Sequence, residues 1–324
     1  MRCTNKALFI TTVLLISSVL TGCIGTGYQM PFDYKTRLSA FNFSSVNFED
    51  TAKPFAYNLC IAEPENTTGG PELSGSGAAG LFDINSRGTI YAKNVHKQMY
   101  PASLTKTMTA LLALKYGHLE DTITASSNVQ ITEQGAQLTG LKEGDRLTLD
   151  QALHALLMYS GNDASVAIAE YISGSQDEFC SLMNKEALEL GATNTHFVNP
   201  HGLSDENHYT TAYDLYLIFN EAMKYDKFKE IIGTTEYTTT YSDRDGNPKE
   251  MSVRNSNMYL TQEKSHPDNV NIIGGKTGTT NMAGSCLILL SNDQKGNPYI
   301  SVVLKAGDRD TLYSDMNSLL KLVP

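Results

Sequence analysis

The sequence predicts an α/β fold with one sheet, helices packed on its faces and a helical subdomain. Two observations carry this prediction. Segments with strand character lie near both ends of the region that begins at about residue 79, and helical periodicities fill the stretch between them. Hydrophobic residues make up 41% of the 324 positions, which is ample for a sizeable core. Two domains would fit this length, and one large domain fits it equally well.

The first strand signal is a hairpin. Two short apolar runs, 81–84 and 89–92, flank the turn-forming residues Asn85-Ser86-Arg87-Gly88. A helix is predicted next over 101–116, because proline suits its first position and a glycine follows its last. The apolar stripe expected on this helix consists of Leu104, Met108, Leu111 and Leu112.

Further helices and strands follow in order. Thr148-Leu149-Asp150-Gln151 is a capping box that opens a second helix, which is expected to end at Ser160-Gly161-Asn162. Two more helices are expected, one from about Asp163 and one over 176–190. Strand character returns after about residue 251 in three segments, 272–277, 286–290 and 299–304. A last helix is predicted from about residue 311.

The first 23 residues resemble a lipoprotein export signal. After a basic start, residues 7–20 are almost wholly apolar, and this run is shorter than the roughly 20 residues of a spanning helix. It ends in Leu20-Thr21-Gly22-Cys23, which resembles the lipobox of bacterial lipoproteins, where cleavage precedes the cysteine and its thiol carries a lipid. An ordinary secretory signal with a chance cysteine is the alternative. We expect 1–22 to be a signal peptide and 23–56 a tether.

The chain is acidic, with a formal net charge of −10. It would repel a phosphate backbone, so nucleic acid is not an expected partner. The cysteines beyond Cys23 are Cys60, Cys180 and Cys286, and their spacing gives neither a disulfide framework nor a metal site. We expect these cysteines to be small core residues, and we expect no metal or cofactor.

Three short strings carry the chemistry. They are Ser103-Leu104-Thr105-Lys106, Ser160-Gly161-Asn162 and Lys276-Thr277-Gly278-Thr279. Together they supply a hydroxyl nucleophile, an amine to activate it, a second hydroxyl, a side-chain amide and a cationic strand, which suits acyl transfer. Ser103 and Lys106 lie three apart on the expected helix, so both leave from one face, which we expect to turn toward a cleft. Lys106 can act as a base only if burial and a second cation, such as Lys276, lower its pKa.

The other two strings would complete such a site. Ser160 could pass a proton to the leaving amine, and the Asn162 amide could hold a substrate peptide group. Small residues around Lys276, Gly278 among them, would let a peptide substrate approach a strand edge closely. Each string alone also fits a purely structural role, namely a helix segment, a helix cap with its turn, or a hairpin turn. Their shared order and wide spacing argue against coincidence.

With these strings the chain resembles the serine penicillin-binding proteins, and most closely the low-molecular-mass D-alanyl-D-alanine carboxypeptidases. The resemblance implies a serine β-lactamase/transpeptidase-like fold with a largely antiparallel sheet, in a catalytic domain over 57–324. It also implies peptidoglycan stem peptides as substrates and β-lactams as covalent inhibitors. The motifs that carry it are Pro101-Ala102-Ser103-Leu104-Thr105-Lys106, Tyr159-Ser160-Gly161-Asn162-Asp163-Ala164-Ser165, Asn199-Pro200-His201-Gly202-Leu203 and Ala283-Gly284.

The resemblance also implies roles for individual residues. Ser103 would attack the carbonyl between the last two D-alanines, Lys106 would take its proton, and Ser160 would help to protonate the departing D-alanine. The backbone N–H groups of Ser103 and Thr279 would form an oxyanion hole.

Recognition of the substrate's terminal carboxylate is implied for Lys276, Thr277 and Thr279. Relatives often carry an arginine just before the aromatic residue of the last helix, where this chain has Leu312. Arg309 is the candidate to replace that arginine.

The leading hypothesis is a carboxypeptidase on the outer face of the bacterial cytoplasmic membrane, anchored by a lipid on Cys23. A β-lactamase is one alternative, but class A enzymes use a positioned glutamate for deacylation, whereas Glu186 and Glu189 fall within a predicted helix. An inactive lipoprotein that binds wall peptides is another, and transpeptidase or endopeptidase action stays open. His154 and His201 belong to no nucleophile motif and are expected to be structural.

Overall fold

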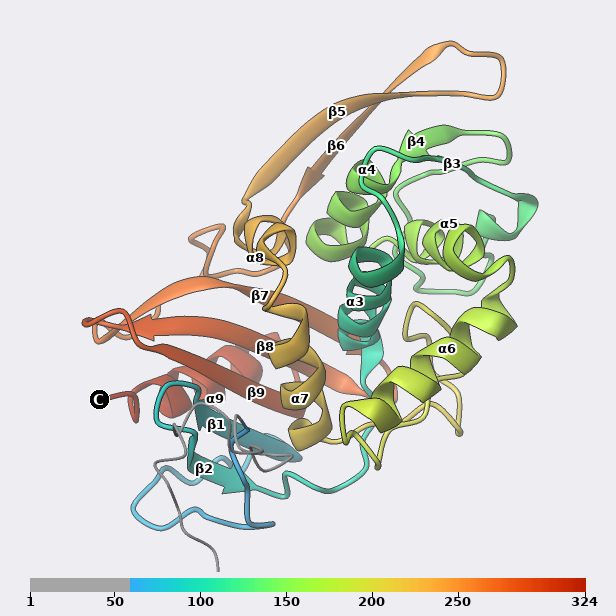
Figure 1. Ribbon diagram of the computed structural model, residues 1–324. Helices are drawn as coiled ribbons and strands as arrows, with labels where there is room; N and C mark the ends of the chain where they lie inside the picture. Colours follow the sequence, from blue (N-terminus) through green and yellow to red (C-terminus); the bar gives the residue numbers. More distant parts are fainter. Residues whose placement is uncertain (1–58) are drawn as a thin grey trace, which may run out of the picture. The chain divides into compact units, whose positions relative to one another are not determined.

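The computed structural model describes residues 59–324 (Figure 1). The predicted signal peptide 1–22, the tether 23–56 and the lipidation site at Cys23 lie outside the described residues. Within residues 59–324, no helix combines the length and the apolar character that crossing a bilayer requires. This part of the chain contains a five-stranded and a four-stranded sheet, with helices packed on and between them.

The larger sheet joins the two ends of the described chain. Its strands are antiparallel and run in the order β2-β1-β9-β8-β7. The predicted hairpin and the three predicted C-terminal strands are confirmed, and they share this one sheet. β7 lies at the edge and pairs with β8 alone. The strands are β1 (Ala78–Asp83), β2 (Gly88–Lys93), β7 (Val270–Thr280), β8 (Gly284–Asp293) and β9 (Pro298–Ala306).

Both faces of this sheet are covered by helices. Side chains alternate along β8, so that Leu287 and Leu289 belong to the core on one face while Ile288 and Leu290 belong to the core on the other. Burial on both sides explains why the middle of β8, over 286–290, is apolar without interruption. The covering helices are α9 (Arg309–Leu320) on the first face and α3 (Lys106–Tyr116), α7 (Ala212–Ala222) and α8 (Asp226–Gly233) on the second.

Helix α3 is the central helix of the fold. It follows a 3-10 turn, η3 (Ala102–Thr105), and ends at Gly117, so the predicted helix is confirmed with an irregular first turn. The expected single apolar stripe was too narrow, because every residue from 106 to 113 is buried. Helices α5 (Asn162–Ser173), α6 (Gln176–Glu189) and α7 contact α3 on different sides. The small side chains of α3 between its leucines permit this close packing.

The second predicted helix ends in an unusual way. The capping box is present, with the Gln151 N–H donating to Thr148 Oγ1 and the Thr148 N–H donating to Gln151 Oε1. The helix that it opens, α4 (Leu149–His154), continues as a π-helical turn, η5 (Ala155–Tyr159). The chain then leaves the helix at Ser160, whose φ of +71° lies in the left-handed region. This sharp turn leads directly into α5.

The second sheet and two helices were not predicted from the sequence. β3 and β4 have only three residues each, which is too short for an alternating pattern to be recognised. β5 and β6 form a long hairpin whose outer positions are polar. The sequence analysis predicts no helix over Ala212–Ala222 or Asp226–Gly233, where the structure has α7 and α8. The sheet has the order β3-β4-β5-β6, with β3 (Thr122–Thr124), β4 (Arg146–Thr148), β5 (Glu236–Ser242) and β6 (Pro248–Arg254).

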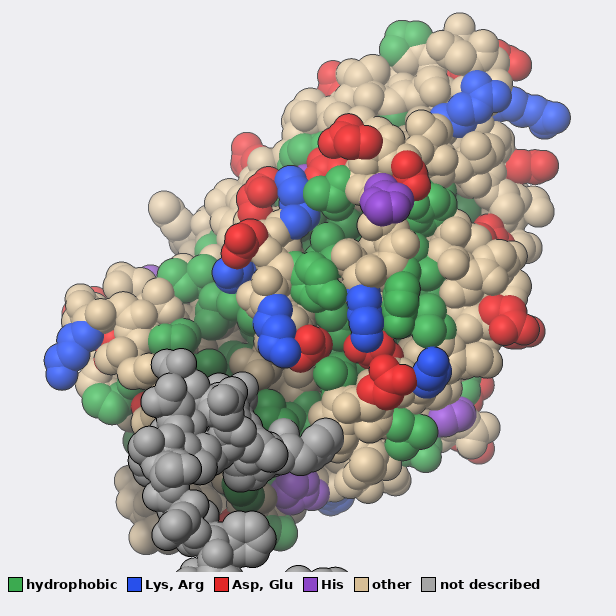
Figure 2. Space-filling view, in the orientation of Figure 1, with side chains coloured by type: hydrophobic (Ala, Val, Ile, Leu, Met, Phe, Trp, Pro, Cys, Tyr) green, Lys and Arg blue, Asp and Glu red, His purple; other side chains and the backbone are tan. Residues whose placement is uncertain are grey.

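Surface charge is mixed rather than segregated. On the face shown in Figure 2, Lys and Arg side chains are interspersed with Asp and Glu side chains. Ion pairs between near neighbours in sequence include Lys224 with Glu221 and Lys229 with Asp226, each at 2.6 Å. Exposed pairs of this kind contribute little to the free energy of unfolding, so stability comes from the buried core. The predicted core cysteines, Cys60, Cys180 and Cys286, are buried and unpaired.

Gly278 stands where the sheet edge meets the turn before α3. A Cβ at this position would lie 2.9 Å from the Ser103 backbone N and 3.1 Å from Ala102 Cβ. We expect Gly278→Ala to lower the free energy of unfolding by about 1–3 kcal/mol, as overpacking does. Gly307→Ala is the matched control, because a Cβ there meets nothing within 4 Å. Denaturant unfolding followed by circular dichroism measures both variants, and equal stabilities would contradict this close approach.

Candidate active site

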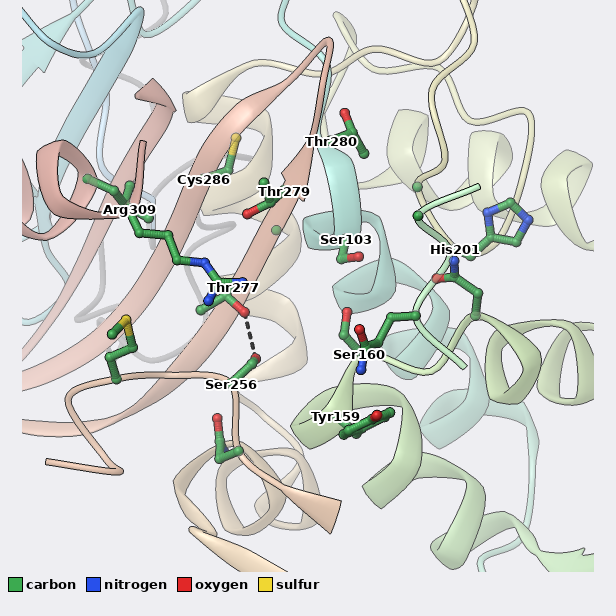
Figure 3. A pocket seen from close by; sticks show the side chains of 18 of the residues that line it. Ser103, Tyr159, Ser160, His201, Ser256, Thr277, Thr279, Thr280, Cys286 and Arg309 are labelled. Carbon is green, nitrogen blue, oxygen red and sulfur yellow. Dashed lines mark hydrogen bonds between the residues drawn. The ribbon is translucent and has the colours of Figure 1, made fainter. Parts of the chain in front are cut away.

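A pocket of about 480 Å³ opens between the edge strand β7 and the helical region. Figure 3 shows Ser103, Ser160, Thr277 and Arg309 facing one space from different elements. Lys106 and Lys276 lie behind its wall and are 0% and 1% exposed. All the candidate site residues predicted within the described chain thus meet in one place. Those that line the pocket are Ser103, Ser160, Asn162, Thr277, Gly278, Thr279 and Arg309.

Ser103 and Lys106 meet at the start of the central helix. Ser103 lies in η3, and Lys106 is the first residue of α3. Lys106 Nζ is 3.0 Å from Ser103 Oγ, which is hydrogen-bond distance. Among the described residues, Lys106 is the titratable side chain that is hydrogen-bonded to the Ser103 hydroxyl. The expected cleft is present on the Ser103 side, but Lys106 itself is enclosed.

The surroundings of Lys106 favour its neutral form. Its pKa is lowered well below the usual value by burial and then by the charge of Lys276, while the carboxylate of Asp163 acts in the opposite direction. Nζ is also 2.7 Å from Asn162 Oδ1 and 2.6 Å from the His201 carbonyl oxygen. A neutral amine has two N–H donors, and these two oxygens accept both. The remaining position at Nζ is then occupied by Ser103 Oγ, 3.0 Å away.

Ser160 and Asn162 come from the turn between η5 and α5. The left-handed conformation of Ser160 ends the π-helical turn, and its hydroxyl points into the pocket (Figure 3). Asn162 is the first residue of α5 and is almost fully buried. The turn therefore holds a hydroxyl on the surface of the pocket and an amide against Lys106.

Lys276 lies in the middle of β7. Its Nζ donates to Ser160 Oγ at 3.0 Å and to the Thr277 carbonyl oxygen at 2.9 Å. Burial lowers its pKa to about 7. Lys276 is thus a second buried amine beside Lys106, and it is linked to the pocket through Ser160.

The far side of the pocket is polar and cationic. Thr277 Oγ1 is 2.6 Å from Ser256 Oγ, and Thr279 lies farther along β7 (Figure 3). Arg309, the first residue of α9, extends toward Thr277. Among residues 59–324 it forms neither an ion pair nor a side-chain hydrogen bond, unlike Arg254 in the same pocket, which pairs with Glu263 at 3.2 Å. A free guanidinium in a polar pocket suits an anionic ligand group.

The sequence predicts no role for Asp163, yet this residue organises one wall of the pocket. Its Oδ1 accepts from the Thr139 N–H at 3.0 Å, and its Oδ2 accepts from the Gly140 and Leu141 N–H groups at 2.8 and 3.1 Å. In addition, the Asn162 N–H donates to the Gln137 carbonyl oxygen at 2.8 Å. The loop over 137–141 is therefore fixed to the turn that carries Ser160. The only signal for this role of Asp163 in the sequence is an acidic residue in the first turn of a helix.

The two histidines of the sequence analysis lie in different places. His154 is in α4, its ring stacked on Tyr237 at 3.8 Å, away from the pocket. His201 lies in a loop, as expected, but it also lines the pocket, and its carbonyl oxygen binds Lys106. Burial lowers the pKa of its ring to about 3, so the ring is neutral at pH 7. The contact through its backbone could not be recognised from residue type.

The two glutamates considered for a β-lactamase lie outside the pocket. Both are in α6, and Glu186 pairs with Lys115 at 2.7 Å. Of the residues that line the pocket in the described chain, Glu263 alone is acidic, and it is bound to Arg254. No pocket glutamate is therefore free of a cationic partner in this part of the chain.

Comparison with known proteins identifies the family. The family model described as D-alanyl-D-alanine carboxypeptidase matches residues 65–308. The chain is 38% identical over 229 residues to the D-alanyl-D-alanine carboxypeptidase DacF of Bacillus subtilis, covering 68% of this chain and 54% of that protein. It is 33% identical over 245 residues to DacD of Salmonella typhimurium, covering 73% and 59%. The chain thus spans somewhat more than half the length of these relatives.

Solved structures agree on the fold. The structure of the Streptomyces K15 DD-transpeptidase is similar, with a TM-score of 0.72 and 26% identity over 78% of this chain and 98% of that chain. The five-stranded antiparallel sheet, its flanking helices and the helical region are those of the DD-transpeptidase and penicillin-binding protein fold. The chain belongs to the serine-type D-alanyl-D-alanine carboxypeptidase family, peptidase family S11.

Proposed function

We propose that this protein hydrolyses the terminal D-alanyl-D-alanine bond of peptidoglycan stem peptides through an acyl-enzyme on Ser103. The observation that carries the proposal is the environment of the Lys106 amine. It lies 3.0 Å from Ser103 Oγ, and its two N–H groups are used by Asn162 and by the His201 carbonyl oxygen. A serine hydroxyl needs such a base within hydrogen-bond reach to act as a nucleophile at neutral pH.

Acylation would proceed in the space between Ser103 and β7. Ser103 Oγ attacks the carbonyl carbon between the two D-alanines as its proton passes to Lys106. The N–H groups of Ser103 and Thr279 hold the oxyanion, and one such donor is typically worth about 10²- to 10³-fold in rate. The close approach of Gly278, the residue before Thr279, to the Ser103 backbone supports this arrangement, because it places the two residues beside each other.

Departure of D-alanine requires a proton on its amine. The Ser160 hydroxyl is accessible from the pocket and lies 3.0 Å from Lys276 Nζ. As the Ser160 hydroxyl gives its proton to the leaving amine, a charged Lys276 passes a proton to Ser160 Oγ along their hydrogen bond. Water then hydrolyses the acyl-enzyme and regenerates Ser103. During deacylation the attacking water gives a proton back through Ser160 to Lys276, and the protonated Lys106 returns its proton to Ser103 Oγ.

Substrate choice would rest on the terminal carboxylate. Lys276 is too deeply buried to reach far into the pocket, so it contributes positive potential. Thr277 and Thr279 offer hydroxyl donors, and Arg309 offers a guanidinium without a carboxylate partner in the described chain. Because a β-lactam carries a similarly placed carboxylate, we propose that β-lactams acylate Ser103 and inhibit the enzyme.

We also propose that the protein acts outside the cytoplasmic membrane, held by a lipid on Cys23. The sequence Leu20-Thr21-Gly22-Cys23 at the end of an apolar run supports this placement. A substrate in the cell wall requires an extracytoplasmic location, which is consistent with such an anchor.

The decisive experiment supplies the full chain with an acyl-D-alanyl-D-alanine tripeptide and measures free D-alanine. We expect steady release by the wild type and a loss of at least about 10³-fold in Ser103→Ala. Equal release by the two proteins would remove Ser103 from the mechanism. In the same preparation, a stoichiometric burst of penicillin cleavage fits a carboxypeptidase, and sustained cleavage would indicate a β-lactamase.

Arg309 is tested by comparison with its neighbour. We expect Arg309→Gln to raise KM for the tripeptide about tenfold, because a charge-assisted hydrogen bond to the carboxylate is lost. Arg254→Gln is the matched control, since the Arg254 guanidinium is already paired with Glu263. Steady-state kinetics of D-alanine release measures both. A larger effect of the control would assign carboxylate binding elsewhere.

The pH dependence follows from the two buried amines. Lys106 must be neutral, so kcat/KM rises as pH increases through its lowered pKa. Lys276 must be charged, and its pKa of about 7 makes kcat/KM fall above neutrality. We expect a bell-shaped profile whose alkaline limb is absent in Lys276→Arg, because guanidinium stays protonated. An unchanged alkaline limb in a folded Lys276→Arg protein would assign that limb to another group.

A further inference from the structure

The peptide unit before the nucleophile is held in an uncommon conformation. Ala102 has a φ of +49°, in the left-handed region, where a residue with a side chain is disfavoured by about 1–2 kcal/mol. Its carbonyl faces Gly202, where a Cβ would lie only 1.9 Å from Ala102 O. Such a conformation persists only when surrounding contacts determine it.

Those contacts form a chain of three hydrogen bonds that ends at this carbonyl. The Val198 N–H donates to His208 Nδ1 at 3.1 Å, so that Nδ1 carries no proton. His208 Nε2 then carries the proton and donates it to Thr105 Oγ1 at 2.8 Å. The Thr105 hydroxyl in turn donates to the Ala102 carbonyl oxygen at 2.9 Å. His208 and Thr105 each accept one hydrogen bond and donate another, so the direction of all three bonds is fixed.

The residues of this hydrogen-bond chain are shielded from solvent and uncharged. Ala102, Thr105 and His208 are each no more than 1% exposed. Burial lowers the pKa of His208 to about 4, so the ring is neutral at pH 7 and keeps the required tautomer. The mechanism described above uses neither His208 nor Thr105.

The planarity of the peptide bond links this chain of hydrogen bonds to the orientation of the Ser103 N–H. The Ala102 carbonyl and the Ser103 N–H belong to one trans peptide unit, so they point in opposite directions. When Thr105 holds the carbonyl toward the interior, the Ser103 N–H must point away from Thr105. The Ser103 nitrogen lies beside β7 at the edge of the pocket, where a Cβ at Gly278 would be 2.9 Å away.

We infer that His208 is a positioning residue, which acts through Thr105 on the Ala102 carbonyl to aim the Ser103 N–H at the oxyanion. This inference rests on the proposed function, because it concerns the rate of Ser103 acylation. A merely structural role, in which His208 ties its loop to the start of α3, would require both of its hydrogen bonds equally. The positioning role depends on one of them, the bond from Nε2.

Two variants separate those bonds. The amide nitrogen of Gln in His208→Gln can occupy the place of Nε2 and keep the donor to Thr105. The amide oxygen of Asn in His208→Asn can occupy the place of Nδ1 and keep the acceptor for Val198. Thr105→Ser and Thr105→Val form a second matched pair, since serine keeps the hydroxyl and valine removes it.

We expect His208→Asn and Thr105→Val to lower kcat for D-alanine release about 10- to 100-fold with little change in KM, because a small misplacement affects the transition state most. His208→Gln and Thr105→Ser should retain most of the rate. The double variant His208→Asn/Thr105→Val should be no slower than either single variant, because both break the same chain. Melting temperatures are measured in parallel, and we expect the losses in kcat not to correlate with the changes in melting temperature.

Equal losses in His208→Gln and His208→Asn, or additive losses in the double variant, would overturn the inference while the wild type stayed active. An inactive wild type would instead refute the proposed function. In that case the Ser103 amide resonance in 15N–1H NMR spectra of the full chain still decides. His208→Asn and Thr105→Val should shift this resonance, and His208→Gln and Thr105→Ser should leave it in place; shifts that ignore this pairing would refute the inference.

Discussion

The buried amine of Lys106 is the constraint on which the rest of the site depends. Desolvation and the nearby Lys276 disfavour its charged form, and the neutral amine then needs acceptors for its two N–H groups. Those acceptors come from α5 and from the loop at His201, 56 and 95 residues away in sequence. Long-range packing must therefore be complete before this amine has a lone pair aimed at Ser103.

The architecture meets that requirement by placing one rigid element on each side of the pocket. β7 is supported by a sheet buried on both faces, and α3 is enclosed by helices on several sides. The segments between them are irregular: a 3-10 turn carries Ser103, and a π-helical turn leads to Ser160. Regular elements fix the distance across the pocket, and irregular turns bring the candidate catalytic side chains to its surface.

Local sequence was sufficient where the signal was local. The capping box at Thr148, the hairpin of β1 and β2 and the apolar run of β8 each depend on neighbours in sequence, and each is present. The three chemical strings could be recognised because their residue types are unusual together. By contrast, the roles of Asp163 and His208 arise from contacts 22–24 and 103 residues away, which no periodicity encodes. β3 and β4 were missed because three residues cannot show a period.

Ser160 illustrates how chemistry and folding make opposite demands on one position. Its left-handed backbone is one that glycine adopts without strain, whereas serine gives up roughly 1–2 kcal/mol of folding free energy there. Selection for thermostability alone would favour glycine at position 160. Such a change would relieve the backbone at the end of the π-helical turn, and it would remove the hydroxyl that accepts from Lys276 Nζ at 3.0 Å.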